Sequence, residues 1–336
     1  MRFFSKLITG VGIDISEHHI RLARVSIFGV VKELIEIEIP DGLIVDEKVE
    51  KLKEVQSLFQ KEFNSASLKD APLRATILLP ESRVFFHSFI AGKELKGEKL
   101  KEKSLSIAQR EIPILFSHAE TAISQGSQEA EGVRTTVYAV DSDVADGFRE
   151  IVSVTPFKVI ATETNSKAIL RFINKYRTKE HLPTKPTDLI ALVDVGHTWI
   201  SVTVYTLKGS NVYSRSNSFK QLGVKTVNRK LPIKGIETSI IETIKEILVY
   251  FNNHEQAITS VYISGLDLLD KQAVSEINKI IGKDSSVFKL GDAFSIKGLD
   301  DKKIQTFGPA IGAALRSAVP WKYTYQHNFL NNKKLK

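Results

Sequence analysis

The chain has 336 residues, of which 42% are hydrophobic and 26% charged, a composition that provides at least one large core and argues against global disorder. It contains no cysteine, which excludes disulfides, thiolate metal sites and thiol catalysis. The net charge is +8, but basic and acidic residues alternate in the densest charged run, 93–103, so we expect no nucleic-acid partner.

The N-terminal segment, residues 1–7, has a basic start and is soon followed by Gly10, Gly12 and Asp14, without a small-residue cleavage site. We therefore expect no signal peptide. We interpret this segment as a frayed lead-in to the first strand, while contact with a membrane surface or a partner stays open. No run of about 20 consecutive apolar residues occurs, so any membrane role is expected to be peripheral.

Alternating and apolar segments predict a mixed α/β structure for the first half of the chain. Three strands joined by tight turns span 11–39, and an amphipathic helix follows over 46–63. A strand pair is expected around Pro80, followed by a helix near 99–111 and later by a helix that Asp141 begins. The strands of this second group are expected at 74–79, 84–90, 120–124, 133–140 and 157–161.

The second half of the chain repeats the beginning of the first. Residues 175–188 are rich in proline and threonine, lack periodicity and predict a linker. Three strands and a helix are predicted after it, at 189–195, 199–207, 211–218 and 238–251. The order of elements in the first meander therefore occurs twice.

The repeat can be written residue by residue, because 12–25 aligns with 192–205 at an offset of 180, which places Asp14 on Asp194. Such self-similarity predicts two lobes whose hairpin tips reach one cleft. A strand that ends in Asp-x-Gly and turns at once into another strand can bind phosphate through backbone amides. Two carboxylates at facing tips suit Mg²⁺ shared with a nucleotide. The alternative is that each aspartate caps a tight turn.

Several segments resemble the actin-like ATPase superfamily and, within it, the PilM family of type IV pilus assembly proteins. One segment, 108–114, is similar to the extra subdomain that PilM shares with the division protein FtsA. The others are the two hairpins, the start of a connecting helix, a turn after a strand and a closing helix, at 12–21, 193–198, 162–168, 263–265 and 307–316.

The resemblance implies an α/β fold: the two-lobed actin-like ATPase (ribonuclease H-like) fold with a small inserted α+β subdomain. Gly308, Gly312 and Ala313 would let the closing helix approach a crossing connector closely, although a simple core role explains them as well. The implied parts are a first lobe at 1–73 and 163–187, on which the closing helix 304–319 packs, an inserted subdomain at 74–162, a second lobe at 188–303 and a tail at 320–336.

The resemblance also implies residues for ATP and Mg²⁺. Asp14 and Asp194 would hold Mg²⁺ through water. Glu163 would position the attacking water, or alternatively stabilise a helix N-terminus without any nucleotide. The remaining candidates for contact with phosphate or the adenosine side are Ser16, Arg21, Gly196, Thr198 and Gly265.

The hairpins depart from the nucleotide-binding pattern. Ser16 stands where glycine is usual, and Glu17 would add repulsion toward a phosphate, on the order of 1 kcal/mol in water at 4 Å. His18 and His19 are adjacent, so their side chains are expected on opposite faces, and we interpret them as turn residues rather than metal ligands. The stretch 222–235 is short for a ribose-contacting helix. Nucleotide binding is therefore expected to be regulatory or lost, with ATPase activity weak or absent.

By resemblance, the protein is a cytoplasmic scaffold at the inner face of the cytoplasmic membrane that binds the N-terminal segment of a PilN-like membrane protein. The resemblance places the groove between the first lobe and the inserted subdomain, and pilus ATPases or a second copy are further contacts to consider. Two other functions stay open: an active Mg-ATPase that drives domain closure, and an FtsA-like filament former. The filament former is disfavoured because 321–336 lacks a helical apolar stripe.

The tail carries one further pattern. Residues 327–331, His-Asn-Phe-Leu-Asn, resemble the Asn-Leu-Leu segment by which PilN-type partners are recognised. A chance match is the alternative. If the pattern is functional, the tail would occupy the protein's own groove or a neighbour's, giving self-inhibition or oligomerisation.

Overall fold

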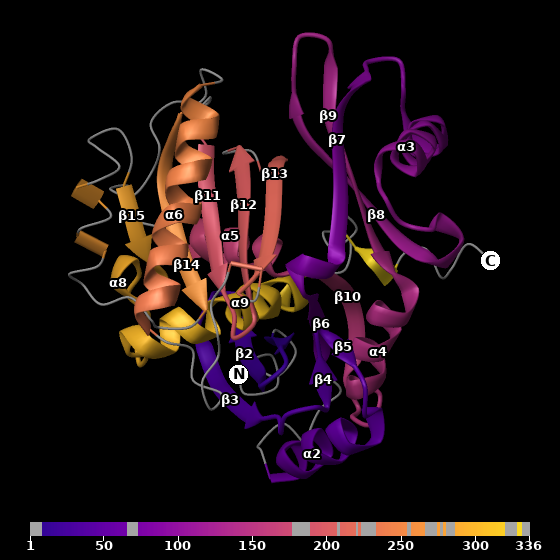
Figure 1. Ribbon diagram of the computed structural model, residues 1–336. Coiled ribbons are helices and arrows are strands. Elements are labelled where there is room, and N and C mark those ends of the chain that lie inside the picture. The colour runs from indigo at the N-terminus through magenta and orange to yellow at the C-terminus, as the bar shows by residue number, and fades with distance from the viewer. Residues whose placement is uncertain are drawn as a thin grey trace. The chain divides into compact units, whose positions relative to one another are not determined.

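The computed structural model describes residues 9–65, 73–176, 189–206, 209–219, 221–222, 233–253, 257–265, 274–275, 278–279, 286–319 and 328–330. The chain divides into two compact units. One unit comprises Met1–Phe172 and Pro309–Lys336, and the other comprises Ile173–Gly308. Each unit carries its own five-stranded sheet (Figure 1).

The sheet of the first unit has the strand order β10-β6-β1-β2-β3. β1 (Thr9–Ile15), β2 (His19–Ser26) and β3 (Val31–Glu38) pair antiparallel, as predicted. β6 (Arg74–Leu79) and β10 (Lys158–Thr164) extend the sheet in parallel on the other side of β1. Every residue of β1 is buried, as expected for a strand in the middle of a sheet.

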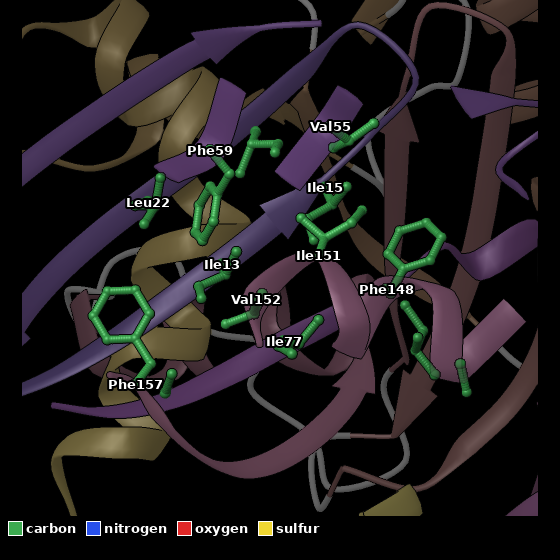
Figure 2. Packing of buried hydrophobic residues seen from close by; sticks show 14 of the residues in the cluster. Ile13, Ile15, Leu22, Val55, Phe59, Ile77, Phe148, Ile151, Val152 and Phe157 are labelled. Atoms are coloured by element: carbon green, nitrogen blue, oxygen red, sulfur yellow. The ribbon is translucent and has the colours of Figure 1, made fainter. Parts of the chain in front are cut away.

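Two helices share one core with this sheet. α2 (Leu52–Ser65) and α4 (Ser142–Val152) pack against each other and contribute large apolar side chains to it. Figure 2 shows Phe59 of α2 and Phe148 of α4 in this cluster with Ile13 of β1. As predicted, Asp141 caps α4, because its side chain accepts a hydrogen bond from the Asp143 N–H at 2.9 Å.

The predicted helix over 46–63 begins later than expected. Residues 44–49 form a small hairpin of β4 (Ile44–Val45) and β5 (Lys48–Val49) instead. Asp46 and Glu47 both have positive φ, 47° and 58°, which is the geometry of a two-residue type I′ turn. Tertiary hydrogen bonds hold this turn, since Arg83 donates to the Asp46 carbonyl oxygen and the Glu47 N–H donates to Glu17.

The inserted subdomain is a three-stranded antiparallel sheet in the order β7-β9-β8, accompanied by one helix (Figure 1). The helix packs on β9 and β7, and its apolar residues share a small core with β9. The elements are β7 (Val84–Gly92), α3 (Gly97–Glu111), β8 (Ala119–Gln128) and β9 (Gly132–Asp141).

Two expectations about this region need correction. β6 and β7 do not form a hairpin: β6 pairs with β1 and β10, whereas the 3-10 turn Glu81–Arg83 leads the chain into the second sheet. The predicted subdomain boundaries of 74 and 162 therefore placed two strands of the main sheet in the insertion, and α4 also packs in the main core. Neighbours in sequence usually pair, which is why the sequence favoured a hairpin here.

The second unit has the order β13-β12-β11-β14-β15, with β14 and β15 parallel to β11 and the first three strands antiparallel. The apolar side of its long helix α6 packs with β11, β12 and β14 in a separate core. The elements are β11 (Leu189–Val195), β12 (Trp199–Thr206), β13 (Asn211–Ser218), α6 (Ile233–Asn252), β14 (Ile258–Gly265), β15 (Ser286–Lys289) and α8 (Leu290–Ala293).

The sheet topology confirms the predicted internal repeat. β1, β2, β3, β6 and β10 occupy the same places in their sheet as β11, β12, β13, β14 and β15 do in theirs. The register agrees as well: Asp14 lies opposite Arg21, and Asp194 lies opposite Ser201, with both positions shifted by the same 180 residues. Every residue pair of the first hairpin has its counterpart in the second at this offset. A chance occurrence of aspartate in two strands would not produce the same register throughout.

Two helices cross at close range through small residues. A Cβ added to Gly312 of α9 (Asp301–Ala318) would lie 2.0 Å from the carbonyl oxygen of Ala168 in α5 (Asn165–Tyr176). Ala313 of α9 also packs with Ala168. At Gly12 of β1, an added Cβ would lie 1.9 Å from the Ala310 carbonyl oxygen. Glycine is therefore required for the helix to approach both neighbours this closely.

The linker was predicted at 175–188, but its first two residues belong to α5, which ends at Tyr176. Residues 177–188 lie outside the described residues. Among the helices that the structure describes, none combines the length and apolar character needed to cross a bilayer.

Candidate functional site

The tip of the first hairpin is closed by its own hydrogen bonds. The Ser16 N–H donates to the His19 carbonyl oxygen at 2.9 Å, and the Ser16 hydroxyl donates to the same oxygen at 3.1 Å. The hydroxyl oxygen also lies 3.3 Å from the His19 N–H. Asp14 is buried just before this turn. The two groups of Ser16 that were expected to meet a phosphate therefore already serve the turn.

Several charged side chains around this hairpin make contacts within the protein. Arg21 is buried, and its Nε donates to Glu36 Oε1 at 2.7 Å across the β2–β3 pair. Glu17 is also buried, and it accepts the Glu47 N–H at 3.0 Å from the β4–β5 turn. His18 lies 3.5 Å from Asp41. Burial, followed by the charge of Arg21, lowers the pKa of the His19 imidazole.

The first hairpin does not fit a magnesium-bound triphosphate. Phosphate binding at such a tip needs amide, hydroxyl or guanidinium donors that face the anion. Ser16 and Arg21 donate within the protein, and Glu17 adds a carboxylate to the same turn. We therefore derive no catalytic step through a nucleotide at this hairpin.

The second hairpin retains more of the expected features. Asp194 Oδ1 accepts the Ser264 hydroxyl at 2.7 Å, which joins the ends of β11 and β14. Gly265 follows with φ of 89°, and an added Cβ there would lie 2.3 Å from the Val195 carbonyl oxygen, so only glycine fits. The Gly196 N–H donates to the Trp199 carbonyl oxygen at 2.8 Å and closes the turn.

The structure therefore brings the candidates together within each unit. The carboxyl ends of β11 and β14 hold Asp194, Gly196 and Gly265. In the same hairpin, the Thr198 carbonyl oxygen accepts the Phe219 N–H at 2.8 Å. The predicted pairing of Asp14 with Asp194 joins residues of different units and stays a prediction.

Glu163 was expected at the start of a connecting helix, but it lies in strand β10. Its side chain is fully buried and contacts two arginines. Arg171 donates to both carboxylate oxygens, at 2.6 and 2.8 Å, and Arg316 donates to the second oxygen. Burial would raise the pKa of the Glu163 carboxyl, but the charges of Arg171 and Arg316 hold the pKa below its usual value. This geometry favours a structural ion-pair triad over the positioning of water.

The residues after Glu163 hold a second charged cluster that the sequence did not single out. Glu81 accepts the Ser166 N–H at 3.1 Å and the Ser166 hydroxyl at 2.9 Å, which caps the first turn of α5. Burial, followed by the charge of Arg171, lowers the pKa of the neighbouring Lys167 to about 8. The signal in the sequence is the polar run 162–167 at a strand-to-helix junction.

A pocket of about 510 Å³ lies within the inserted subdomain, between the start of α3 and the sheet. Lys93 and Lys96 line it together with apolar side chains such as Leu95, Leu100 and Val133. None of the predicted ATP or Mg²⁺ residues borders it.

Comparison with known families gives one match. Residues 12–232 match the family described as type IV pilus assembly protein PilM, which covers both hairpins and the whole inserted subdomain. No curated protein sequence matches the chain.

Solved structures with similar folds are numerous, and several of them span nearly the whole chain. A chain of a PilM–PilN type IV pilus biogenesis complex shares 16% identity at a TM-score of 0.72, over 93% of this chain and 99% of that one. A Bacteroides thetaiotaomicron protein with actin-like ATPase fold and unknown function has a TM-score of 0.49, 12% identity and coverages of 90% and 97%. The ethanolamine utilization protein EutJ from Carboxydothermus hydrogenoformans has a TM-score of 0.48 and 11% identity, over 91% of this chain and 89% of that one. The match at a TM-score of 0.72 and the family match show that the fold is the one that the resemblance to PilM implied, the actin-like ATPase fold.

Proposed function

This chain belongs to the PilM family of type IV pilus assembly proteins, and we propose that it is a cytoplasmic scaffold that holds the N-terminal segment of a PilN-like membrane protein. The observation that carries the proposal is the fold match to a chain of a PilM–PilN complex over 93% of the length. In this role the protein would sit at the inner face of the cytoplasmic membrane through its partner.

Sheet edges in the first unit supply a physical basis for holding an extended segment. β7 is one of the two outer strands of the inserted sheet, and β10 is one of the two outer described strands of the main sheet. An edge strand offers backbone N–H and C=O groups to a peptide, and neighbouring apolar side chains add specificity. Phe85 and Ile90 of β7 are also unusually exposed for their size, at 40% and 38%.

We propose further that nucleotide binding is degenerate. The donors of the first hairpin are engaged within the protein, as Ser16 and Arg21 illustrate. A second candidate function, an active Mg-ATPase, draws support from the second hairpin, where Asp194 and Gly265 keep the expected arrangement.

The test is co-purification of the full chain with a synthetic N-terminal cytoplasmic segment of the PilN-like protein encoded by the same organism. A scrambled segment of equal composition is the control. We expect binding of the native segment alone, to a similar extent with and without Mg-ATP. Failure to bind under both conditions contradicts the scaffold, and binding that requires Mg-ATP favours the ATPase. Co-purifying pilus ATPases or a second copy would identify the additional contacts.

A further inference from the structure

The C-terminal segment returns to the first unit and contacts the edge of β10. Asn328 and Phe329 are both buried, and Phe329 has no exposed surface. Its ring belongs to the core that β1, α2 and α4 share. Eight residues separate Asn328 from Val319, whose carbonyl oxygen is bound by Arg74 at 2.7 Å.

The Asn328 side chain forms hydrogen bonds with backbone groups of β10, as a neighbouring strand would. Its Oδ1 accepts the Thr162 N–H at 3.0 Å, and its Nδ2 donates to the Ile160 carbonyl oxygen at 3.0 Å. The register of β10 against β6 shifts between Val159 and Ala161, which marks a bulge at Ile160. A primary amide carries one acceptor and two donors, so it satisfies both backbone groups at once. Aspartate lacks the donor that the Ile160 carbonyl oxygen requires.

We propose that residues 328–330 are an intramolecular ligand of a peptide-binding site on the β10 edge. The site accepts a short segment in which asparagine is followed by a bulky apolar residue in a 3-10 turn, where the Asn328 Oδ1 also accepts the Leu330 N–H at 3.1 Å. The asparagine side-chain amide of the segment would form the two hydrogen bonds to β10, and its apolar side chain would take the place of Phe329 in the core. The assignment of the natural competitor to the PilN-like segment rests on the proposed function, whereas the site itself does not.

The short tether makes the tail a strong competitor. A ligand joined to its site by a short linker has an effective concentration on the order of mM. If the intrinsic dissociation constant of the tail is on the order of 1 μM, the apparent dissociation constant of any competing segment rises by about 10³-fold. The site would therefore stay closed to weak segments and open to a partner that is tethered nearby at the membrane.

The experiment uses the full chain and a labelled synthetic peptide of residues 325–333 as the probe. Two variants weaken the tail differently. N328D/F329A removes its contacts, and an insertion of about 30 glycine and serine residues between 319 and 328 keeps the contacts while lowering the effective concentration about tenfold. F219A, which removes a buried phenylalanine from the core of the second unit, is the matched control for lost packing.

We expect the probe to bind the double variant at least tenfold more tightly than the native chain, and the insertion variant about tenfold more tightly. The control should bind like the native chain. A probe that carries aspartate in place of asparagine should bind none of them. Equal affinity for all variants, or indifference to that aspartate, would overturn the proposal, and the insertion variant keeps the test decisive if the double variant does not fold.

The PilN-like segment is then added as an unlabelled competitor to the insertion variant. Displacement of the probe supports the same site for partner and tail. If the probe behaves as expected but the PilN-like segment neither displaces it nor binds, the proposed function fails while the peptide site stands.

Discussion

At the scale of single residues, buried charges in the first unit are arranged to support the fold. Glu163 joins β10, α5 and α9 through Arg171 and Arg316, and Arg171 also donates to the Gly312 carbonyl oxygen at 2.9 Å. A carboxylate without any exposed surface is tolerated only because charge-assisted hydrogen bonds occupy both oxygens. The residue expected to serve catalysis thus anchors the crossing helices.

Replacing Glu163 with glutamine should lower the free energy of unfolding by about 3 kcal/mol, because the substitution removes the charge that the buried Arg316 and Arg171 both contact. Urea denaturation followed by circular dichroism measures the change. The control is Glu246→Gln, which removes an exposed pair with Arg215 and should change the stability by less than about 1 kcal/mol. Equal effects of the two substitutions would show that the buried triad is not important for stability.

The same carboxyl predicts a pH dependence. Its pKa is lower in the folded protein than its ordinary value of 4.5, so the unfolded chain takes up the proton first as the pH falls. The stabilisation that Glu163 provides is therefore present above pH 4.5 and is lost as the pH falls through the folded-state pKa. The stability difference between the native chain and Glu163→Gln should narrow below pH 4.5 in urea titrations at stepped pH. A difference that stays constant to pH 3 contradicts this assignment.

At the scale of elements, the crossing of α5 and α9 depends on the absence of side chains. Gly312→Ala should lower the free energy of unfolding by about 2 kcal/mol, since the new Cβ would lie 2.0 Å from the Ala168 carbonyl oxygen and the two backbones would have to separate. Gly147→Ala in α4 is the control, because its Cβ would meet only the Val49 side chain, at 3.3 Å, and alanine favours the helix. A neutral effect at Gly312 would contradict the close crossing.

At the scale of the whole molecule, the two units share one sheet topology but differ in the residues at their hairpin tips. The repeat keeps the same hairpin register in both. Only the second hairpin keeps Asp-x-Gly, whereas the first has Ser16 and Glu17 with internal hydrogen bonds. Duplication thus accounts for the fold, and the unequal hairpins account for our proposal that the protein holds a partner rather than turns over nucleotide.

This proposal predicts no magnesium-dependent ATP binding at submillimolar nucleotide. Isothermal titration calorimetry of the native chain, with and without Mg²⁺, measures it. Asp194→Asn is the comparison, since it removes the charge that Ser264 supports at the second hairpin. Heat of binding that disappears in Asp194→Asn would instead identify an active nucleotide site and favour the ATPase.

The sequence alone determined the features that depend on local periodicity. Strands 9–15 and 19–26, the capped helix after Asp141 and the repeat at an offset of 180 residues could all be predicted, because alternation, caps and turns are written in neighbouring residues. The closing helix and its small residues were predicted from family resemblance and confirmed by the close approach of Gly312 to Ala168.

Only the tertiary structure decided the features that depend on residues far apart in the chain. β6 joins the main sheet rather than a hairpin, and Asp46 and Glu47 turn because Arg83 and Glu17 hold them. Asn328 reaches Ile160 and Thr162 across more than 160 positions. No local pattern encodes these contacts, because a hydrogen-bond donor or a buried carboxylate acquires its role only from the partner that folding brings to it.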